Sequence, residues 1–455
     1  MNKKIIIIGG GISGLSLLHY LRQRYSDRSD IQIRLIERNP EIGGTIKTIH
    51  RNGLIFETGP NGFLDSKQSI RNLIEELNLN NDVISANPDS QKRFIAIDHQ
   101  LHAFPSDFQS FLSFKPLSIR QKVRILGEVV VAPGGHPDET VYDFGSRRFG
   151  EGCAKIFFDP MVNGIYAGDI HQLNLRLAFP SLNELEQKHG SLIKGLLLKK
   201  KPDTHHKKSS SMINGELKSL KNGMSQLIQT IHGRYWEYIQ TKESVSNIIA
   251  HDQRFIVETN LQSYAADEIF LTVPAYSAAQ ITKNLNRNLS TQLEQIYYAP
   301  IAVAGLVYKK SDLKLKPSGF GYLVPSWQSK EILGVVFESL IFPNRTEQDY
   351  VLLRVMIGGV CHPEILKKSE PELIAIAQEE IQLIFGTLNN PIDQLIKVWP
   401  KAIPQYDSTY LSAFRVIQKE MNRLKNIYIA ANYWGGVSLN DCIANAKNTS
   451  LQSKL

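Results

Sequence analysis

The feature that most constrains the fold is a glycine-rich turn close to the start of the chain. It follows an apolar run typical of a buried strand, Ile5 to Ile8, and carries the pattern Gly-x-Gly-x-x-Gly at Gly9, Gly11 and Gly14. Apolar residues at helical spacing then continue from Ile12 to Arg24. A strand, a glycine turn and a helix in this order predict the first part of a β-α-β unit.

A second apolar strand, residues 32–36, ends at an acidic residue, Glu37. In a dinucleotide-binding unit, the first glycine allows the tight turn, the second lets the backbone approach a pyrophosphate, and the third lets helix and strand pack closely. The helix N-terminus offers free N–H groups to the phosphates, and the acid accepts hydrogen bonds from ribose hydroxyls. The alternative, an ordinary glycine-rich turn, leaves the agreement of strand, helix and acid unexplained.

The composition suits a large protein with a well-formed core. Of the 455 residues, 42% are hydrophobic and 21% charged, which favours two or three structural units and excludes a disordered chain. The net charge of +8 can attract nucleic acid, anionic lipid or an acidic small molecule, or it can belong to a mildly basic enzyme. No nucleic-acid-binding module is recognised, so we expect no nucleic-acid partner.

Cysteine usage and hydropathy limit the cellular context. Cys153, Cys361 and Cys442 are far apart and form no CxxC pair, so neither a disulfide framework nor a metal site is expected, and a reducing compartment fits. The apolar run after Lys3 and Lys4 is too short for a signal peptide. No apolar stretch is long enough to span a bilayer, so any membrane association is expected to be peripheral.

Two further glycine clusters indicate FAD rather than NAD. Gly43 and Gly44 come six residues after the acid, and the stretch GLIFETGP occupies residues 53–60. Both resemble the glycine motifs of the FAD-dependent, amine-oxidase-like flavoproteins. A second close approach of the backbone suits an extended FAD.

The resemblance becomes more specific in the middle of the chain. The stretch FDPMVNGIYAGD, residues 158–169, is similar to a signature of the protoporphyrinogen oxidases. Residues 175–192, 220–224, 319–325 and 430–442 resemble that family in the same order. The matches extend from residue 5 to about residue 446, nearly the whole chain.

The resemblance implies an activity and a cofactor. An FAD-dependent oxidase of this family removes six electrons from a porphyrinogen over three cycles, with hydride passing from a bridge carbon to the flavin and O2 as the expected acceptor. Haem biosynthesis is the implied context, and protoporphyrinogen IX the implied substrate. The cofactor carries the chemistry, so no catalytic side chain and no metal are expected.

The resemblance also assigns substrate contacts. Arg93 matches an arginine that the family directs at a propionate carboxylate, and a guanidinium suits that group because it offers two parallel donors. Phe320 and Leu323 are expected to pack on the faces of the macrocycle, and Gly321 to let the ring lie close to the backbone. Without the family position, Arg93 reads as an exposed arginine, and Phe320 and Leu323 as core residues.

A larger set of residues is expected to bind the cofactor: Gly9, Gly11, Ile12, Ser13, Gly14, Glu37, Arg38, Gly43, Gly44, Thr45, Gly59, Pro60, Asn61, Val245, Trp434, Gly436, Val437 and Ser438. Two of them depart from the family pattern. Thr45 stands where a basic residue is common, and Asn61 where some members have arginine. The departures leave the phosphate contacts at these positions open.

The expected fold is α/β with α+β insertions: a Rossmann-like FAD-binding domain, an inserted mixed-sheet substrate domain and a helical membrane-facing domain. The FAD-binding domain is assigned to residues 1–90, 211–275 and 411–455, the helical domain to 91–210 and the substrate domain to 276–410. Aromatic residues between 104 and 114, followed by a basic loop at 199–211, suit a peripheral membrane contact, and a packed aromatic cluster is the alternative. A cytoplasmic location, on the inner face of the membrane, and a homodimer are expected from the family.

Other functions stay open at this stage. Oxidation of coproporphyrinogen III to coproporphyrin III by a related enzyme is the nearest alternative. A flavin amine oxidase or a carotenoid desaturase is more distant, and the stretch at residues 158–169 argues against both. A non-enzymatic FAD-binding assembly protein would hold a flavin that no porphyrinogen reduces.

Overall fold

The computed structural model describes residues 3–199, 215–328 and 330–455, which divide into two compact units. The first unit contains residues 3–86, 215–297 and 409–455, and the second contains 87–199, 298–328 and 330–408 of the described chain. Each unit is therefore assembled from segments that are distant in the sequence. The basic loop predicted at 199–211 lies almost wholly outside the described residues.

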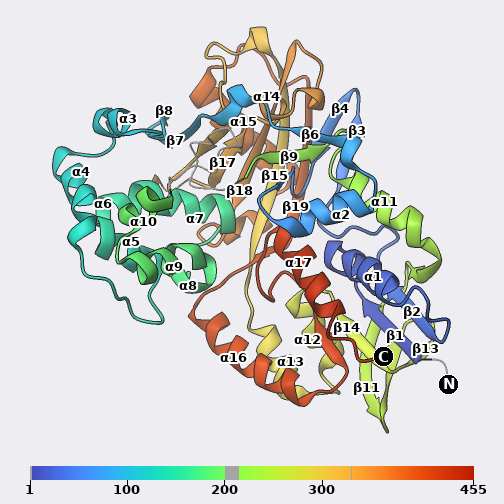
Figure 1. Cartoon of the computed structure of the whole chain (residues 1–455). Helices are drawn as coiled ribbons and strands as arrows, with labels where there is room; N and C mark the ends of the chain where they lie inside the picture. Colours follow the sequence, from blue (N-terminus) through green and yellow to red (C-terminus); the bar gives the residue numbers. More distant parts are fainter. Residues whose placement is uncertain (1–2, 200–214, 329) are drawn as a thin grey trace. The chain divides into compact units, whose positions relative to one another are not determined.

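A five-stranded parallel sheet forms the centre of the first unit (Figure 1). Its strands, in spatial order, are β10 (Ile239–Gln240), β2 (Ile31–Ile36), β1 (Lys3–Ile8), β14 (Glu268–Leu271) and β20 (Ile427–Ile429). Ile8 lies opposite Ile36 on one side and Leu271 on the other, so the carboxyl ends of these strands meet at one edge. This is the edge at which open α/β sheets bind ligands.

Side chains along β1 point alternately to the two faces of the sheet. Ile5 and Ile7 are fully buried in an apolar cluster, together with residues of the helices that cover this face. These helices are α1 (Ile12–Arg24), α2 (Gln68–Glu76), α11 (Ser225–Tyr235) and α17 (Leu439–Ser450). The sequence placed the first of them at the bounds that the structure has, because apolar spacing and the glycine turn define both of its ends.

Smaller elements complete the first unit. An antiparallel sheet consists of β11 (Val245–His251), β12 (Arg254–Thr259) and β13 (Ser263–Ala266). The others are β3 (Thr48–Arg51), β4 (Leu54–Glu57), β5 (Phe63–Leu64), β6 (Val83–Ser85), β9 (Leu217–Leu220), α12 (Ala275–Thr282), α13 (Arg287–Glu294) and α16 (Ser408–Arg423).

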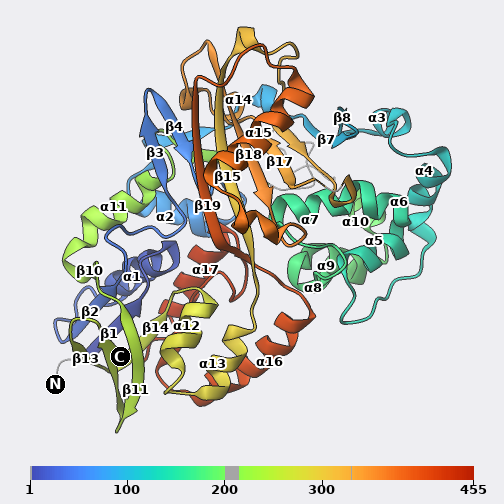
Figure 2. The same ribbon diagram turned by 180° about the vertical axis from the view of Figure 1, so that it is seen from behind.

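The second unit is built on a seven-stranded mixed sheet. Its strands, in spatial order, are β19 (Asp393–Pro404), β15 (Tyr298–Lys309), β18 (Tyr350–Gly358), β17 (Ile332–Val336), β16 (Gly321–Leu323), β7 (Arg93–Ile97) and β8 (Gln100–Ala103). Only the pairing of β16 with β7 is parallel. The long helix α15 (Glu370–Phe385) lies over β15, β18 and β19 in Figure 2 and buries its apolar face in the core of this sheet.

Residues 108–199, within the range assigned to the helical domain, form a series of short helices in the second unit. They are α3 (Phe108–Ser113), α4 (Ile119–Leu126), α5 (Val141–Phe149), α6 (Glu151–Cys153), α7 (Asp159–Tyr166), α8 (Leu175–Ala178), α9 (Pro180–His189) and α10 (Leu192–Lys199). A further short helix is α14 (Glu338–Ile341). In the described part of the chain, no helix is long and apolar enough to cross a membrane.

The boundaries of the two units differ from the predicted domain boundaries, most clearly at residues 276–297. Residues 276–297 were assigned to the substrate domain, but they form α12 and α13, which belong to the first unit. One contact within this unit is a hydrogen bond that the side chain of Asn286 donates to Glu420 of α16 at 2.9 Å. The structure also gathers 91–199 and the residues from 298 to 408 into one compact unit rather than two separate domains.

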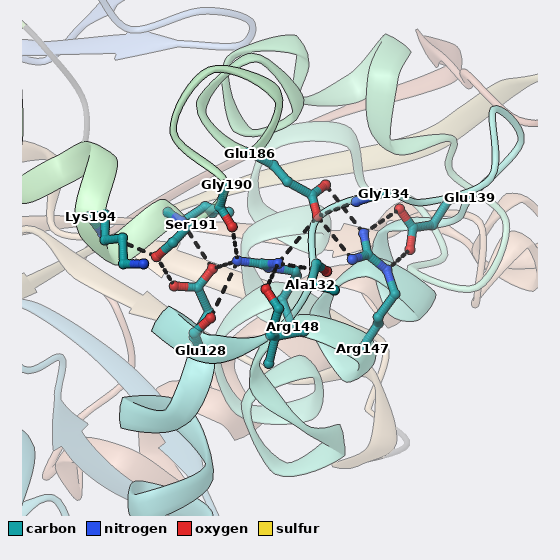
Figure 3. A network of polar contacts seen from close by, with 12 residues as sticks. Glu128, Ala132, Gly134, Glu139, Arg147, Arg148, Glu186, Gly190, Ser191 and Lys194 are labelled. Atoms are coloured by element: carbon teal, nitrogen blue, oxygen red, sulfur yellow. Dashed lines mark hydrogen bonds and ion pairs between the residues drawn. The ribbon is translucent and has the colours of Figure 1, made fainter.

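A buried ionic network ties the short helices together (Figure 3). Glu128 and Arg148 are both fully buried and form an ion pair. Glu128 also accepts a hydrogen bond from the hydroxyl of Ser191 at 2.5 Å and from the backbone N–H groups of Leu192 and Ile193 at 3.0 and 3.2 Å. The Glu128 carboxylate therefore accepts hydrogen bonds from the first turn of α10 and also pairs with Arg148 of α5.

The network extends through a second arginine. Arg147 pairs with Glu139 at 2.7 Å and with Glu186 at 2.9 Å, and Glu186 lies 3.4 Å from Arg148. Burial by itself would raise the pKa of Glu128, but the hydrogen bonds from Ser191 and Arg148 outweigh it and lower that pKa below its ordinary value. Glu128 is therefore a carboxylate in the folded protein at neutral pH.

We predict that Glu128→Gln lowers the free energy of unfolding by about 3 kcal/mol at neutral pH, because it leaves the charge of Arg148 without its closest partner. Glu151→Gln is the control, since that carboxylate is exposed on α6 and should change the stability little. Urea denaturation followed by circular dichroism measures both variants. Equal midpoints for the two would contradict a structural role for the pair.

The same variant has a predictable pH dependence. A carboxylate whose pKa is lower in the folded state contributes its full stability above the unfolded pKa, about 4.3, and loses it as the pH falls through the folded value. The stability difference between wild type and Glu128→Gln should therefore be full at neutral pH and shrink below about pH 4.

Candidate functional site

The glycine turn lies between the carboxyl end of β1 and the start of α1. A Cβ atom at Gly14 would lie 2.0 Å from the carbonyl oxygen of Gly9, so the helix packs directly on the turn. Gly9 has φ of +112°, and a Cβ there would meet Val273 at 2.8 Å. At Gly11, in contrast, a Cβ would meet no atom within 4 Å, so the space in front of it is open. Two glycines thus allow close packing and the middle one faces free space.

Glu37 is held against this turn. Its Oε2 accepts a hydrogen bond from the backbone N–H of Gly10 at 2.7 Å. Its Oε1 accepts two hydrogen bonds from Asn39, from the backbone and the side chain, both at 2.8 Å. Because a carboxylate has about four acceptor sites, Glu37 retains capacity for one more donor, such as a ribose hydroxyl.

The second glycine pair lies directly beside the first motif. The N–H of Gly43 donates to the carbonyl of Gly10 at 2.8 Å, and Gly11 and Gly43 form an isolated parallel bridge. Gly44 has φ of +61° and would place a Cβ 3.4 Å from the Cα of Gly11. Farther along, Gly59 approaches the carbonyl of Thr45 so closely that a Cβ there would lie 1.9 Å away. The clusters that indicated FAD are therefore in contact with the turn and with each other.

The C-terminal motif reaches the same region through α17, which packs against α1. Ser438 caps this helix by accepting the N–H of Asp441 at 3.2 Å, and Gly436 before it has φ of +132°. Ser13 of α1 hydrogen-bonds the thiol of Cys442, whose pKa burial raises to about 11. That thiol therefore stays protonated at neutral pH.

All the residues that the sequence assigned to the cofactor belong to the first unit. The more distant ones lie as follows. Val245 opens β11, shortly after Glu243, whose N–H donates to the carbonyl of Glu37 at 3.0 Å. Arg38 is exposed, and the ring of Trp434 packs on Phe414 with centroids 4.8 Å apart. Individual cofactor contacts of these residues stay predictions.

The four residues assigned to the substrate belong to the second unit. Arg93 and Gly321 lie opposite each other where β7 pairs with β16, and the Arg93 guanidinium carbon is 5.1 Å from the centre of the Phe320 ring. Arg93 as a residue is exposed, but protein atoms around its guanidinium exclude water and lower its pKa from the ordinary value. An arginine stacked in this way is held in place with its donors available.

The strand pairing places a requirement on Gly321 that is separate from its predicted contact with the substrate. The sequence predicted that it would let a macrocycle approach the backbone. In the structure, a Cβ at Gly321 would lie 2.2 Å from the carbonyl oxygen of Val335, and φ is +147°. The close pairing of β16 with β17 therefore already requires glycine at this position.

The stretch FDPMVNGIYAGD and the loop after β16 form one assembly. Asp159 accepts hydrogen bonds from the N–H and the hydroxyl of Ser326 at 2.6 and 2.7 Å. The side chain of Asn163 donates to the carbonyl of Val324 at 3.2 Å. Leu323 rests on α7, where a Cβ at Gly164 would lie 2.6 Å from its side chain. Asp159, Asn163 and Gly164 thus join two motifs that are more than 150 residues apart in the sequence.

Sequence reasoning missed one buried polar group behind the same strand. Glu380 of α15 accepts a hydrogen bond from the hydroxyl of Tyr322 at 3.1 Å and pairs with Lys330 at 3.0 Å. Lys330 also lies 3.1 Å from Nδ1 of His99, in the turn between β7 and β8. Alternation along β16 indicates that Tyr322 faces away from Leu323, but nothing local marks Glu380. Glu380 thus anchors the side chain of Tyr322 on β16, two residues after Phe320.

Comparison with known proteins agrees with this geometry. A family model for flavin-containing amine oxidoreductases matches residues 12–451. This chain belongs to that family.

Among curated relatives of this flavin-containing amine oxidoreductase is protoporphyrinogen oxidase 1, chloroplastic, of Arabidopsis thaliana, 28% identical over 98% of this chain and 87% of the relative. Another is coproporphyrinogen III oxidase of Bacillus subtilis, 24% identical over 98% and 96%. A crystal structure from Exiguobacterium sp. 255-15 superposes with a TM-score of 0.85 at 22% identity, over 99% of this chain and 98% of the other. Putrescine oxidase superposes with a TM-score of 0.69 at 13% identity, over 99% of both chains.

The protein is an FAD-dependent oxidoreductase, and the residues of the first unit fit this cofactor. Gly11 leaves open space for a pyrophosphate, and Glu37 has acceptor capacity for a ribose. No side chain caps the start of α1 within the described chain, so its first N–H groups are available to phosphate oxygens. The described residues contain no group of three or more His, Cys, Asp or Glu side chains arranged to hold a metal ion.

We predict that Gly11→Ala weakens FAD binding by at least about tenfold while leaving the fold intact, since the added methyl group meets no protein atom but occupies the space of the pyrophosphate. Titration of the apoprotein with FAD, followed by flavin fluorescence, measures the affinity. Gly233→Ala on α11 is the control, because a Cβ there also meets no atom within 4 Å. Wild-type FAD affinity in Gly11→Ala would show that the pyrophosphate lies elsewhere.

Proposed function

We propose that this protein oxidises a porphyrinogen to the corresponding porphyrin in haem biosynthesis, with protoporphyrinogen IX as substrate. The observation that carries the proposal is the arrangement of the second unit around β16. There the stretch at 158–169 packs on Leu323, and Arg93 stacks on Phe320. Relatives that match nearly the full chain and are named protoporphyrinogen oxidase support the same activity.

Arg93, Phe320 and Leu323 would each contribute to substrate binding in a way that suits its side chain. The Arg93 guanidinium binds a propionate carboxylate through two parallel hydrogen bonds. Phe320 and Leu323 supply apolar surface for a flat ring system and exclude water from it. On the side of β16 away from Leu323, Glu380 anchors Tyr322 and pairs with Lys330.

FAD, when bound, supplies the acceptor for hydride from a bridge carbon of the macrocycle. Removal of six hydrogen atoms converts the porphyrinogen to the porphyrin, and three molecules of O2 would accept them as three molecules of H2O2. The chain contributes orientation of the substrate by Arg93 and exclusion of water by its apolar neighbours.

A second substrate is supported by a specific observation. The Bacillus subtilis relative named coproporphyrinogen III oxidase matches 98% of this chain. Coproporphyrinogen III carries four propionates and protoporphyrinogen IX carries two, so the two substrates would differ in the number of cationic groups that they engage. Direct comparison of the two substrates therefore decides between them.

We predict that the purified protein oxidises protoporphyrinogen IX faster than coproporphyrinogen III, as followed by porphyrin fluorescence in air above an enzyme-free control. Arg93→Ala should raise KM at least about tenfold, the loss expected for one charged hydrogen-bonded contact, with a smaller effect on kcat. Arg176→Ala, at an exposed arginine of α8, is the control and should match wild type. A faster reaction with coproporphyrinogen III would select the second substrate, and a flavoprotein that oxidises neither would sink the proposal.

We also propose a peripheral contact with the cytoplasmic face of a membrane. Several large apolar side chains are exposed on and around α3 and α4: Phe104, Phe108, Leu112, Ile119, Val123, Leu126 and Val130. Ile119 and Val123 are 80% and 63% exposed and lie one turn apart on α4, which also carries Arg120 and Lys122. Apolar side chains beside basic ones suit the interface of an anionic bilayer.

We predict that the protein floats with vesicles that contain anionic lipid, and that Ile119→Asp with Val123→Asp abolishes the flotation, because both charges would enter the bilayer interface. The control is Leu261→Asp, at a leucine of the first unit that is 66% exposed. Flotation that survives in the double variant would rule out α4 as the contact.

A further inference from the structure

A cavity of about 770 Å³ lies in the first unit, apart from the glycine turn. Its walls come from the N-terminal parts of β1 and β2, the end of α1 and the strand β13. The strand β10 pairs with β2 only at Leu35 and Ile36. On the side of β2 away from β1, residues Ile31 to Arg34 therefore have no neighbouring strand among the described residues. The cavity includes this edge.

The cavity and the dinucleotide site lie at opposite ends of the same strands. Lys4 and Ile31 line the cavity, whereas Gly9 and Glu37 follow the carboxyl ends of β1 and β2. The four steps along β1 from Lys4 to Ile8 correspond to roughly 13 Å, and the two steps to Ile8 from Ile6, the last lining residue of this strand, to roughly 7 Å. A ligand in the cavity would thus not be part of a dinucleotide bound at the glycine turn.

Two arginines enter the cavity in the same manner. The guanidinium carbon of Arg22 lies 4.6 Å from the ring centre of Tyr238, and that of Arg34 lies 4.6 Å from the ring centre of Tyr264. The hydroxyl of Tyr264 donates to the buried carboxylate of Glu243 at 3.0 Å, which fixes this ring. Stacking on a tyrosine restricts each guanidinium and so lowers the entropy that it loses when it binds an anion.

The charge of the lining is strongly positive. Four basic residues line the cavity, namely Lys4, Arg22, Arg28 and Arg34, against one acidic residue, Asp27. Arg28 is already paired with Asp30 at 2.7 Å. In the part of the chain that the structure describes, no ion pair joins Lys4, Arg22 or Arg34 to a carboxylate. Three cations at one concave surface are available to an external anion.

We propose that this cavity binds a small molecule that carries at least two oxyanion groups, phosphate or carboxylate. Paired guanidinium groups match the oxygen geometry of both groups, and the volume is that of an ordinary ligand site. Tyr238 and Tyr264 add ring surface beside the charges, which suits a ligand with a flat or apolar body. This site is independent of the proposed oxidation and of the FAD site.

The test measures binding of sodium pyrophosphate and, separately, citrate to the FAD-loaded protein by calorimetry, with sulfate at matched ionic strength as the single-oxyanion reference. Saturable binding of one equivalent of pyrophosphate or citrate is expected. Tighter binding of pyrophosphate would identify a phosphate ligand, and tighter binding of citrate a carboxylate ligand. Absence of saturable binding by either probe, or equal binding of sulfate, would overturn the proposal.

Variants locate the binding. Arg22→Gln with Arg34→Gln should weaken the better probe at least about tenfold, because two charged contacts are lost. Arg287→Gln, at an exposed arginine of α13 outside the cavity, should bind like wild type. Unchanged affinity in the double variant would overturn the site. If the double variant does not keep its flavin spectrum, Arg34→Gln alone decides the question, with a smaller loss expected and an unchanged affinity again contradicting the proposal.

Discussion

The close approach of backbone at the glycine turn is the constraint on which the first unit depends. Because Gly14 has no side chain, α1 can start directly above the carbonyl of Gly9, and its free N–H groups then face the carboxyl edge of the sheet. Gly43 attaches to the same turn by a hydrogen bond to Gly10, and Glu37 attaches by accepting from that residue's N–H. The cofactor-binding capacity thus results from packing that the backbone requires, with only Gly11 left open to a ligand.

Local patterns predicted this part of the fold because its signals are short-range. The apolar run of β1, the glycine spacing and the helical periodicity of α1 are all contained within residues 3–24. The position of β20 beside β14 could not be predicted in this way, since their pairing joins residues about 160 positions apart. The assignment of residues 276–297 differed from the structure for the same reason: two short helices are compatible with either domain, and long-range contacts such as that of Asn286 with Glu420 place them in the first unit.

The second unit shows why distant motifs of the sequence occur together. Asp159 and Asn163 use their polar atoms on the backbone and side chain of the segment 324–326, and Gly164 makes room for Leu323. Burial raises the pKa of Asp159 from its ordinary value, while the hydrogen bonds from Ser326 oppose that shift. A reader of the sequence sees a signature at 158–169 and a loop at 319–325, but not that one supports the other. The strand that requires glycine at position 321 is likewise invisible in the local pattern.

Arginine illustrates how far the environment, rather than residue type, determines function. Arg148 is fully buried, and its two terminal nitrogens donate to Glu128 and to several carbonyl groups, so its role is structural. The guanidinium carbons of Arg93, Arg22 and Arg34 lie over aromatic rings instead, and an aromatic ring positions a guanidinium without neutralising its charge. A carboxylate partner satisfies an arginine, whereas an aromatic partner only orients it. Oriented arginines are therefore the places where this chain can bind anionic groups of other molecules, at Arg93 for the proposed substrate and at Arg22 and Arg34 for a second ligand.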